Sequence, residues 1–329
     1  MDVYQGLGVA TFVASLLTII GNSLVVVAFQ MLKSHSSKPS NLLILALAYA
    51  DLVYGTYMFV YYGVPLAFGL GHPYGELGCK LTILVDYSYN FGNLLLIAIS
   101  IDRVLLVSVK YPRYTKLQSA FRVKITIAIC FCISLSGSLI EFSLWNYARR
   151  NYETASNIDY DQYCLYPTRR MKWFGLYISF GSFCTPSFII CILSGVFFVK
   201  LYGRIRKSRK IGSDGASVTT YSERSAEPTQ TSNNTQQDEG GRKRYVKPAV
   251  TLAGLVAAMC ISNLPYCIFL IVEIWYPPSS MVNYILWLNL QLNPLLDLIA
   301  YAATQKHVRK FYKKKITNIA CGWFATTVN

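Results

Sequence analysis

The chain has 329 residues, of which 53% are hydrophobic and only 14% are charged. A soluble domain carries about a quarter charged residues, so this composition excludes an ordinary soluble protein. The formal net charge of +15 is spread over separate loops beside apolar segments. That distribution argues against nucleic-acid binding and favours attraction to the anionic inner leaflet of a lipid bilayer.

Seven apolar segments are long enough to cross a bilayer as helices, which takes about 20 residues. The first, Leu7 to Met31, is too long for a cleaved signal peptide and lacks a basic leading region, so we expect a retained helix. The other six are expected at about 41–66, 78–106, 123–145, 172–201, 248–275 and 280–303. The predicted fold class is therefore all-α, a seven-transmembrane helix bundle over residues 1–303.

The basic residues predict the orientation of the bundle. With the N-terminus outside, 25 of the 31 Lys and Arg residues fall on the cytoplasmic side or at its helix ends. The outer side then keeps Lys80, Arg149, Arg150, Arg169, Arg170 and Lys172. The opposite orientation would invert the preference for basic residues inside the cell.

Two cytoplasmic segments lie outside the predicted spans. Residues 211–241 are polar and low in aromatic residues, which predicts a disordered loop. Residues 304–329 are expected to form a short amphipathic helix on the inner membrane surface and a tail, because apolar residues recur there at helical spacing between Lys and Arg. Cys321 in this tail is either a palmitoylation site or a free thiol.

Ionisable residues inside membrane spans are costly and are functional candidates. Within or at the ends of the spans they are Asp51, Asp86, Asp102, Arg103, Glu141, Glu273 and Asp297. We interpret Glu141 and Glu273 as interfacial or loop-facing groups. Cys79 and Cys164 are the two cysteines on the oxidising outer side and are natural disulfide partners.

Landmark residues appear along the chain in a characteristic order. They are Gly21-Asn22 in the first span, Asp51 in "LALAYADL", Cys79 and Asp102-Arg103 at the two ends of the third, Pro186, Pro265 and Asn293-Pro294. Over nearly its whole length, the chain resembles the rhodopsin-like (class A) G-protein-coupled receptors. The resemblance implies a plasma-membrane receptor, without a cofactor, that activates a heterotrimeric G protein and is met by kinases and arrestin. It places G-protein coupling at Asp102 and Arg103.

The third and seventh spans resemble the amine branch of that class. "DYSYNFGNLLLIAISIDR" and "WLNLQLNPLL" are similar to the muscarinic acetylcholine receptors and to the third and fourth histamine receptor subtypes. The resemblance implies a small cationic ligand whose ammonium group binds Asp86. It places Tyr87, Tyr266 and Trp287 as aromatic faces and Ser182 as a polar contact. The histamine subtypes carry a carboxylate where Ser182 stands, which argues against histamine itself.

The spacing within the third span departs from these families. Asp86 and Arg103 are 17 positions apart, one fewer than usual, and one residue corresponds to about 100° of helix rotation. We expect local overwinding between Tyr87 and Asn93 to absorb the difference. Otherwise Asp86 rotates away from the ligand site.

A central polar cluster is also implied by the resemblance. Asp51, Asn289 and Asn293 form a candidate sodium site, although Gly92 replaces the family's hydroxyl in the third span. Three further departures fall where the family switches between states: Asn263 replaces a tryptophan, Ser194 a tyrosine and Asp297 a tyrosine. We therefore predict either an altered equilibrium between inactive and active states or weak conventional signalling.

Other functions fit the sequence less well. The same fold with a structural Asp86 would sense a peptide, lipid or odorant-like ligand. A transporter or channel would show inverted repeats and glycine-interrupted helices, and no internal repeat is visible. An enzyme has no support, because no nucleophile–base arrangement or metal-ligand spacing is found in the sequence.

Overall fold

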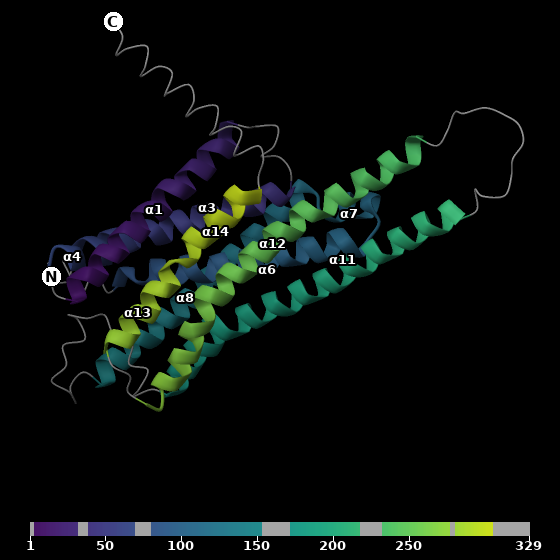
Figure 1. Cartoon of the computed structure of the whole chain (residues 1–329). Coiled ribbons are helices and arrows are strands. Elements are labelled where there is room, and N and C mark those ends of the chain that lie inside the picture. The colour runs from purple at the N-terminus through teal and green to yellow at the C-terminus, as the bar shows by residue number, and fades with distance from the viewer. Residues whose placement is uncertain are drawn as a thin grey trace, which may run out of the picture.

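The computed structural model describes residues 3–31, 39–69, 80–152, 172–217, 232–276 and 280–304, and throughout these ranges the regular structure is helical. The helices form one bundle (Figure 1). Six are apolar and long enough to cross a membrane: 5–31, 39–67, 83–108, 120–147, 172–206 and 249–273. A shorter apolar helical stretch, Ile285–Ala300, provides the seventh. The prediction of an all-α seven-transmembrane bundle is confirmed.

The first two spans pack closely against each other. α1 (Val3–Met31) lies beside α3 (Pro39–Met58), which continues through a π-helical segment, η1 (Phe59–Gly63), into α4 (Val64–Ala67). Added Cβ atoms at Gly8 and Gly63 would meet the backbones of Leu66 and Phe12. Glycine is therefore required at both crossings, as is usual where membrane helices approach closely.

The third span is central in the bundle and the fourth lies at its edge. α6 (Ile83–Ser108) contacts α3, α8 and α11. A short helix between the third and fourth spans, α7 (Tyr111–Leu117), leads to α8 (Ala120–Tyr152). Only 22% of the fourth span's most apolar window is buried, so most of its apolar surface is available to lipid.

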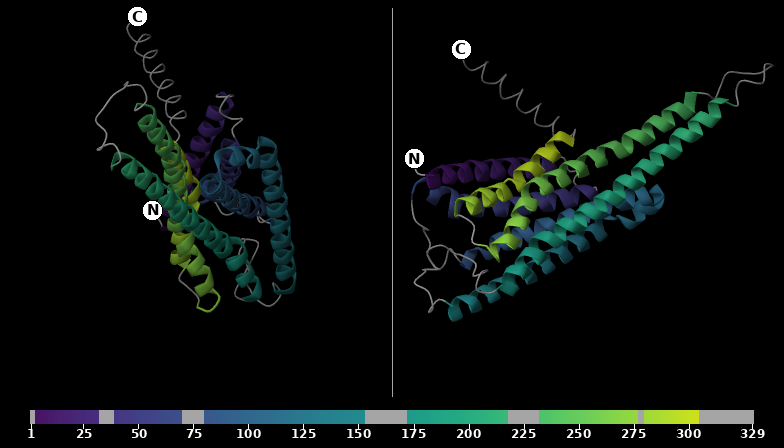
Figure 2. Two further views of the ribbon diagram at one scale, coloured as in Figure 1. Left: turned by 90° about the vertical axis from the view of Figure 1, so that its right-hand side faces the viewer. Right: turned by 60° about the horizontal axis from the view of Figure 1, so that its bottom comes forward.

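The fifth and sixth spans extend side by side well beyond the other helices (Figure 2). The fifth consists of α10 (Lys172–Tyr177), the π-helical η3 (Ile178–Cys184) and α11 (Thr185–Ser217), and the sixth is α12 (Ser232–Glu273). The expected loop therefore contains helix at 211–217 and 232–241. Adding residues to an existing helix costs less than starting a new one.

The seventh span is broken in the middle. α13 (Ser280–Gln291) and α14 (Asn293–Thr304) are separated by a turn at Leu292. Pro294 accounts for the break, because it has no N–H to donate and its ring clashes with the preceding turn.

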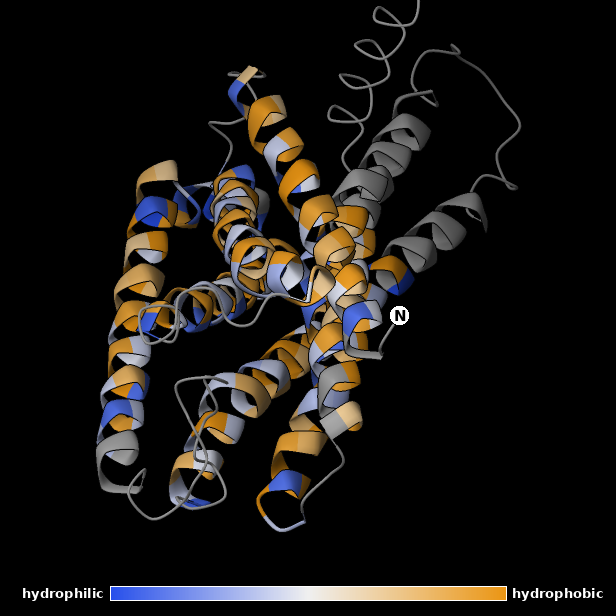
Figure 3. Cartoon of the chain, turned by 90° about the vertical axis from the view of Figure 1, so that its left-hand side faces the viewer, coloured by the Kyte–Doolittle hydropathy of each residue, from blue (hydrophilic) through white to orange (hydrophobic). Residues whose placement is uncertain are grey.

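Hydrophobic residues cover most of the helical surfaces, and hydrophilic ones gather near several helix ends (Figure 3). The main buried cluster joins the first three spans with the fourth, fifth and sixth, and includes Leu47, Leu95, Ile99, Ile190 and Met259. A second cluster joins the third, fifth and sixth spans near the predicted cytoplasmic end, around Val107, Phe197, Leu201 and Leu252. This second cluster closes the bundle at that end.

The expectation of overwinding in the third span is wrong. α6 remains an α-helix without interruption from Ile83 to Ser108, so no change of helix type absorbs the one-residue difference. This α-helix is 26 residues long. The direction of Asp86 is therefore set by its neighbours.

Candidate functional site

Asp86 faces a group of tyrosines that come from two other spans. Its charge acts on the phenol groups of Tyr54 and Tyr57 on α3 and of Tyr266 on α12. Asp86 is half-buried in the first turn of α6. Despite the short spacing to Arg103, Asp86 therefore lies within electrostatic range of tyrosines on the second and sixth spans.

One aromatic wall of this site comes from the second and seventh spans. The rings of Tyr57 and Tyr61 are stacked with centroids 4.3 Å apart, and Tyr62 meets Trp287 edge-on at 4.7 Å. Tyr61 and Tyr62 lie in η1, just before Pro65. Pro65 cannot donate to the helix ladder, and the wider π turn before it changes the direction of the two tyrosines.

The other aromatic wall comes from the third, fifth and sixth spans. Phe183 in η3 packs against Tyr89 at 4.7 Å and against Tyr266 at 5.2 Å between ring centroids. Tyr266 in turn stacks on Phe269 at 6.0 Å. Asp86, the first wall (Tyr54, Tyr57, Tyr61, Tyr62 and Trp287) and this second wall (Tyr89, Phe183, Tyr266 and Phe269) are called the tyrosine site below.

The tyrosine site combines a carboxylate with aromatic faces. A cation over such faces gains electrostatic attraction that strengthens as water is removed, and the carboxylate supplies the opposite charge. Asp86 lies within electrostatic range of Tyr266, and Trp287 contacts Tyr62 of the first wall; that these three residues bind a ligand stays a prediction. Four tyrosines of the first wall were missed, although the run of tyrosines from Tyr54 to Tyr62 was a visible signal.

Tyr87 lies on a different side of α6. Its ring packs against Phe91 at 5.7 Å and against Phe131 of α8 at 5.4 Å. Tyr87 thus belongs to an aromatic cluster between the third and fourth spans, and its observed ring contacts are not with the tyrosine site.

Ser182 meets a residue whose position we predicted wrongly. Its hydroxyl donates a short hydrogen bond to Oε1 of Glu141, which is only 4% exposed. Asn90 on α6 lies close to the Glu141 side chain. Glu141 is therefore not interfacial or loop-facing, because α8 directs it towards the third and fifth spans.

A sequence signal for Glu141 existed. Ser134, Ser138, Glu141 and Trp145 recur at intervals of four, three and four residues, which places them on one face of a helix. All four are buried. A polar stripe on an otherwise apolar, lipid-exposed helix indicates the face that turns inward.

Asn93 compensates for the proline of the fifth span. Pro186 has no N–H, so the carbonyl of Ser182, four residues earlier, loses its helical partner. Asn93 Nδ2 donates to this carbonyl at 3.2 Å. Such satisfaction by a neighbouring helix is how membrane helices tolerate proline.

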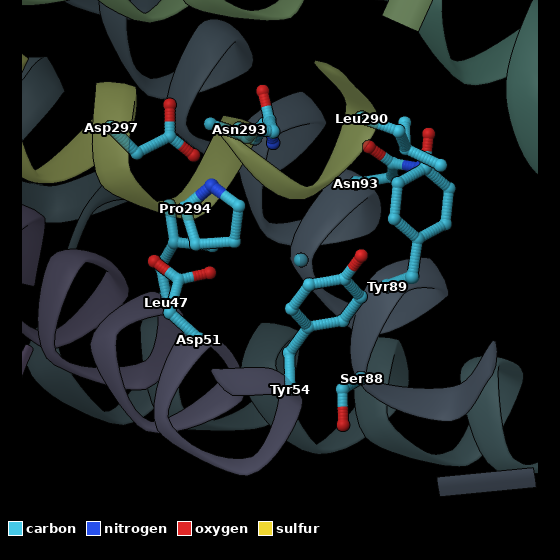
Figure 4. A pocket seen from close by; sticks show the side chains of 12 residues that line it. Leu47, Asp51, Tyr54, Ser88, Tyr89, Asn93, Leu290, Asn293, Pro294 and Asp297 are labelled. Carbon is cyan, nitrogen blue, oxygen red and sulfur yellow. The ribbon is translucent and has the colours of Figure 1, made fainter. Parts of the chain in front are cut away.

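A second site lies deeper, between the second, third and seventh spans. A cavity of about 20 Å³ is lined by Leu47, Asp51, Tyr54, Ser88, Tyr89, Gly92, Asn93, Leu96, Leu290, Asn293, Pro294 and Asp297. Figure 4 shows Asp51 and Asp297 at one end of this cavity and Tyr89 and Asn93 at the other. One Asp51 oxygen and both Asp297 oxygens are buried without a hydrogen-bond partner. The volume suffices for about one water molecule or a small ion.

The predicted sodium ligands are only partly assembled at this cavity. Asp51 and Asn293 line it, and Asp297 joins them. Asn289 does not line it, because its Nδ2 donates to the carbonyls of Ile261 at 2.9 Å and of Ser262 at 3.2 Å. Asn293 Oδ1 also accepts a hydrogen bond of 2.8 Å from Ser262 Oγ.

The three residues that depart from the family at switch positions share one property. Ser194, Asn263 and Asp297 are buried, and Ser194 Oγ, Asn263 Nδ2 and both Asp297 oxygens have no hydrogen-bond partner. Unsatisfied buried polar groups raise the free energy of the state that contains them. This property supports the predicted change in equilibrium between states.

The Asp102–Arg103 pair in the third span is buried, and both carboxylate oxygens of Asp102 have partners. Arg103 Nη1 lies 3.1 Å from Asp102 Oδ2, which also accepts a hydrogen bond of 3.0 Å from Ser40. Tyr114 of α7 donates to Asp102 Oδ1 at 2.8 Å. Burial and the charge of Asp102 raise the pKa of Tyr114 to about 12, so its hydroxyl keeps its proton at neutral pH. The two residues that the resemblance assigns to G-protein coupling thus form an ion pair with each other.

Three predicted positions lie outside the described residues. They are Cys79 and Cys164, expected to form a disulfide, and Cys321, a candidate for palmitoylation. The expected amphipathic helix after the seventh span also lies outside the described residues.

Comparison with known proteins agrees with this arrangement. A family model described as "7 transmembrane receptor (rhodopsin family)" matches residues 21–296. Trace amine-associated receptor 9 of Rattus norvegicus is 27% identical over 323 residues, covering 92% of this chain and 85% of that protein. Muscarinic acetylcholine receptor M5 of Rattus norvegicus is 31% identical over 140 residues, covering 42% of this chain and 24% of that protein.

These relatives are both of the amine-receptor branch that the third and seventh spans suggested. The family match covers well over half of the chain and includes the tyrosine site, the Asp102–Arg103 pair and the residues that line the cavity except Asp297. The chain therefore belongs to the rhodopsin family of seven-transmembrane receptors, and it is a membrane-spanning receptor rather than an enzyme.

Proposed function

We propose that this receptor binds a small cationic amine at the tyrosine site and activates a heterotrimeric G protein. The observation that carries the proposal is the position of Asp86 within electrostatic reach of Tyr54, Tyr57 and Tyr266. An ammonium group placed there meets a carboxylate and several aromatic faces. The similarity to an amine receptor over 92% of the chain supports the same class of ligand.

The ligand would enter from outside the cell. The distribution of Lys and Arg supports an extracellular N-terminus, and Asp86 lies near the outer end of the third span in that orientation. We infer a location in the plasma membrane, where an extracellular amine and an intracellular G protein meet the same molecule.

Signalling would proceed by a shift between two populations. In the structure, Val107, Phe197, Leu201 and Leu252 close the predicted cytoplasmic end between the third, fifth and sixth spans. Ligand binding would favour a state in which the fifth and sixth spans separate there. Asp102 would then release Arg103 to meet the G protein, and kinases and arrestin would act on the same open state.

An amine panel tests the proposal. Cells that express the receptor are exposed to monoamines, diamines and matched neutral analogues, with several G-protein types as readouts. We expect responses to cationic compounds only, and Asp86→Asn lowers their potency at least tenfold at unchanged surface expression. Responses to neutral ligands that survive Asp86→Asn would instead favour a peptide, lipid or odorant-like ligand with a structural Asp86.

A transporter or channel would give a different result in the same panel. Ligand-driven flux in proteoliposomes, without G-protein activation, would replace the receptor mechanism. Measuring flux and G-protein activation on one preparation separates the two.

A further inference from the structure

A second acidic group lies next to the tyrosine site. Glu141 is 4% exposed, and its carboxylate accepts a hydrogen bond from Ser182 of the fifth span and lies close to Asn90 of the third. Asn90 follows Asp86 by one helical turn on the same face of α6, an axial offset of roughly 6 Å. The two carboxylates are therefore arranged along one side of the third span.

Phe183 connects the two acidic positions. It follows Ser182 directly in η3, and its ring contacts Tyr89 and Tyr266 of the tyrosine site. It also packs against the buried cluster of Trp145, Phe174 and Ile178 on the Glu141 side. One continuous aromatic surface thus runs from the neighbourhood of Asp86 to the neighbourhood of Glu141.

The Glu141 group has only neutral hydrogen-bond partners. Among the residues that the structure describes, Arg103 and Asp102 form an ion pair, and no basic side chain forms one with Glu141. A buried carboxylate is stable only when a counter-charge or several hydrogen bonds replace its water. The hydroxyl of Ser138, one turn along the same face of α8, is completely buried and has no hydrogen-bond partner. This hydroxyl could therefore bond to a further polar group near Glu141.

We propose that Glu141 and Ser182 form a second polar subsite that selects amines carrying a second basic or hydrogen-bond-donating group. This inference rests on the proposed function, in which the first ammonium group binds Asp86. The second group of the ligand lies beside Phe183 and donates to the Glu141 carboxylate. The preferred ligand class is a diamine, or an amine joined to a basic ring. Its two nitrogens are farther apart than the rise of one helical turn, about 5.4 Å.

The competing explanation is structural. In that case Glu141 and Ser182 only fasten the fourth span to the fifth, and Glu141 never meets a ligand. The two explanations differ in one measurable respect: a structural fastener affects all ligands equally, whereas a subsite affects only ligands with a second group.

The experiment compares diaminoalkanes of increasing chain length with monoamines of matched carbon number. On the unmodified receptor we expect an optimum at intermediate length, where the diamine is at least about tenfold more potent than its monoamine, the usual effect of a charge-assisted hydrogen bond. Glu141→Gln should remove this preference and leave monoamine potency within about threefold. Glu141→Asp should restore part of it, because the charge is kept.

Ser182→Ala is the matched control. It removes the hydrogen bond between the fifth and fourth spans but keeps the Glu141 charge, so the diamine preference should weaken less than in Glu141→Gln and should not disappear. If Glu141→Gln fails to reach the cell surface, the length series on the unmodified receptor and Glu141→Asp still decide the question.

Two results would overturn the inference. One is equal potency of diamines and monoamines at every length, and the other is an equal loss for both classes in Glu141→Gln. Either result leaves the proposed function intact, provided that monoamines act through Asp86. If neither class of amine acts, the proposed function fails together with this inference.

Discussion

The side-chain amide of Asn289 in the seventh span donates a hydrogen bond of 2.9 Å to the carbonyl oxygen of Ile261 in the sixth. Ile261 lies four residues before Pro265, so its carbonyl has no partner within its own helix. Asn93 makes the same connection to Ser182, four residues before Pro186. Two prolines that bend spans are thus each matched by an asparagine from another helix, and these contacts fix neighbouring spans to one another.

We predict that Asn289→Ala destabilises the receptor by about 1 to 2 kcal/mol, because it leaves the Ile261 carbonyl without a hydrogen-bond partner inside the membrane. Thermal unfolding of the detergent-solubilised receptor measures this change. Pro265→Ala restores a backbone N–H for Ile261, so in this background Asn289→Ala should cost distinctly less. Equal costs in both backgrounds would show that the amide does not act through the Ile261 carbonyl.

Asn263 offers a test of the altered equilibrium between states. It is fully buried beside Ser262, which links the sixth span to Asn293 of the seventh. We expect Asn263→Trp to change basal G-protein activity, since a large ring replaces an unsatisfied amide at the contact between moving spans. Asn263→Leu, of nearly the same size as asparagine, is the control for loss of the amide alone and should be neutral or stabilising. Unchanged basal activity in Asn263→Trp at normal expression contradicts the hypothesis.

The cavity between Asp51 and Asp297 predicts a response to sodium. If a cation occupies it, sodium chloride should raise thermal stability relative to choline chloride, by about 1 kcal/mol when sodium is several times its dissociation constant. Asp51→Asn should abolish this shift and Asp297→Asn should reduce it. Asn289→Ala should retain the shift, because Asn289 does not line the cavity. Loss of the shift in Asn289→Ala would restore the ligand set expected from the sequence.

Tyr114 should restrain the Asp102–Arg103 pair. Tyr114→Phe removes a 2.8 Å hydrogen bond to Asp102, and bonds to charged groups are worth about 1.5 to 3 kcal/mol. We therefore expect basal activity to rise several-fold, with a smaller rise in Ser40→Ala, whose bond to Asp102 is longer at 3.0 Å. A basal level equal to that of the unmodified receptor would exclude a restraining role.

The same contact has a defined pH dependence. The pKa of Tyr114 in the folded receptor is raised to about 12, above the ordinary value of about 10. The stability that protonated Tyr114 gives the folded receptor is therefore complete below pH ~10. It is lost as the pH rises towards the pKa of Tyr114 in the folded receptor. Between pH 6 and 9, roughly, the effect of Tyr114→Phe should be constant.

Cys191 and Cys260 provide a probe of movement between the fifth and sixth spans. Their sulfur atoms are 3.9 Å apart, so a membrane-permeable oxidant should join them and hold the spans together. Cleavage of the chain between residues 218 and 231, which lie outside the described ranges, then yields two fragments that separate only under reducing conditions. The oxidised receptor should lose its response to ligand, and Cys191→Ala should retain it. A full response with the cross-link formed would contradict separation of these spans at this depth.

The sequence determined the membrane fold almost completely. The number of spans, their approximate limits and the family landmarks follow from long apolar segments and a few fixed residues, because a bilayer permits only helices with internally satisfied backbones. The same landmarks indicated Asp86, Tyr266 and Trp287 as candidate ligand contacts. The spacing of polar residues in the fourth span also indicated which face of that helix turns inward. Glu141 was nevertheless interpreted wrongly, because its position near the outer end of the span suggested exposure to water.

Only the tertiary structure decided which side chains meet. Tyr87 and Ser182 lie on the correct helices, yet Tyr87 packs on Phe131 and Ser182 bonds to Glu141, since the rotation of each helix depends on its neighbours. Asn289 was expected at an ion site and instead donates a hydrogen bond to the Ile261 carbonyl. Pro265 leaves that carbonyl without its helical partner, and the local sequence does not show which residue replaces it. The sequence shows which polar groups require hydrogen-bond partners, and the packing of the helices determines which partners these groups have.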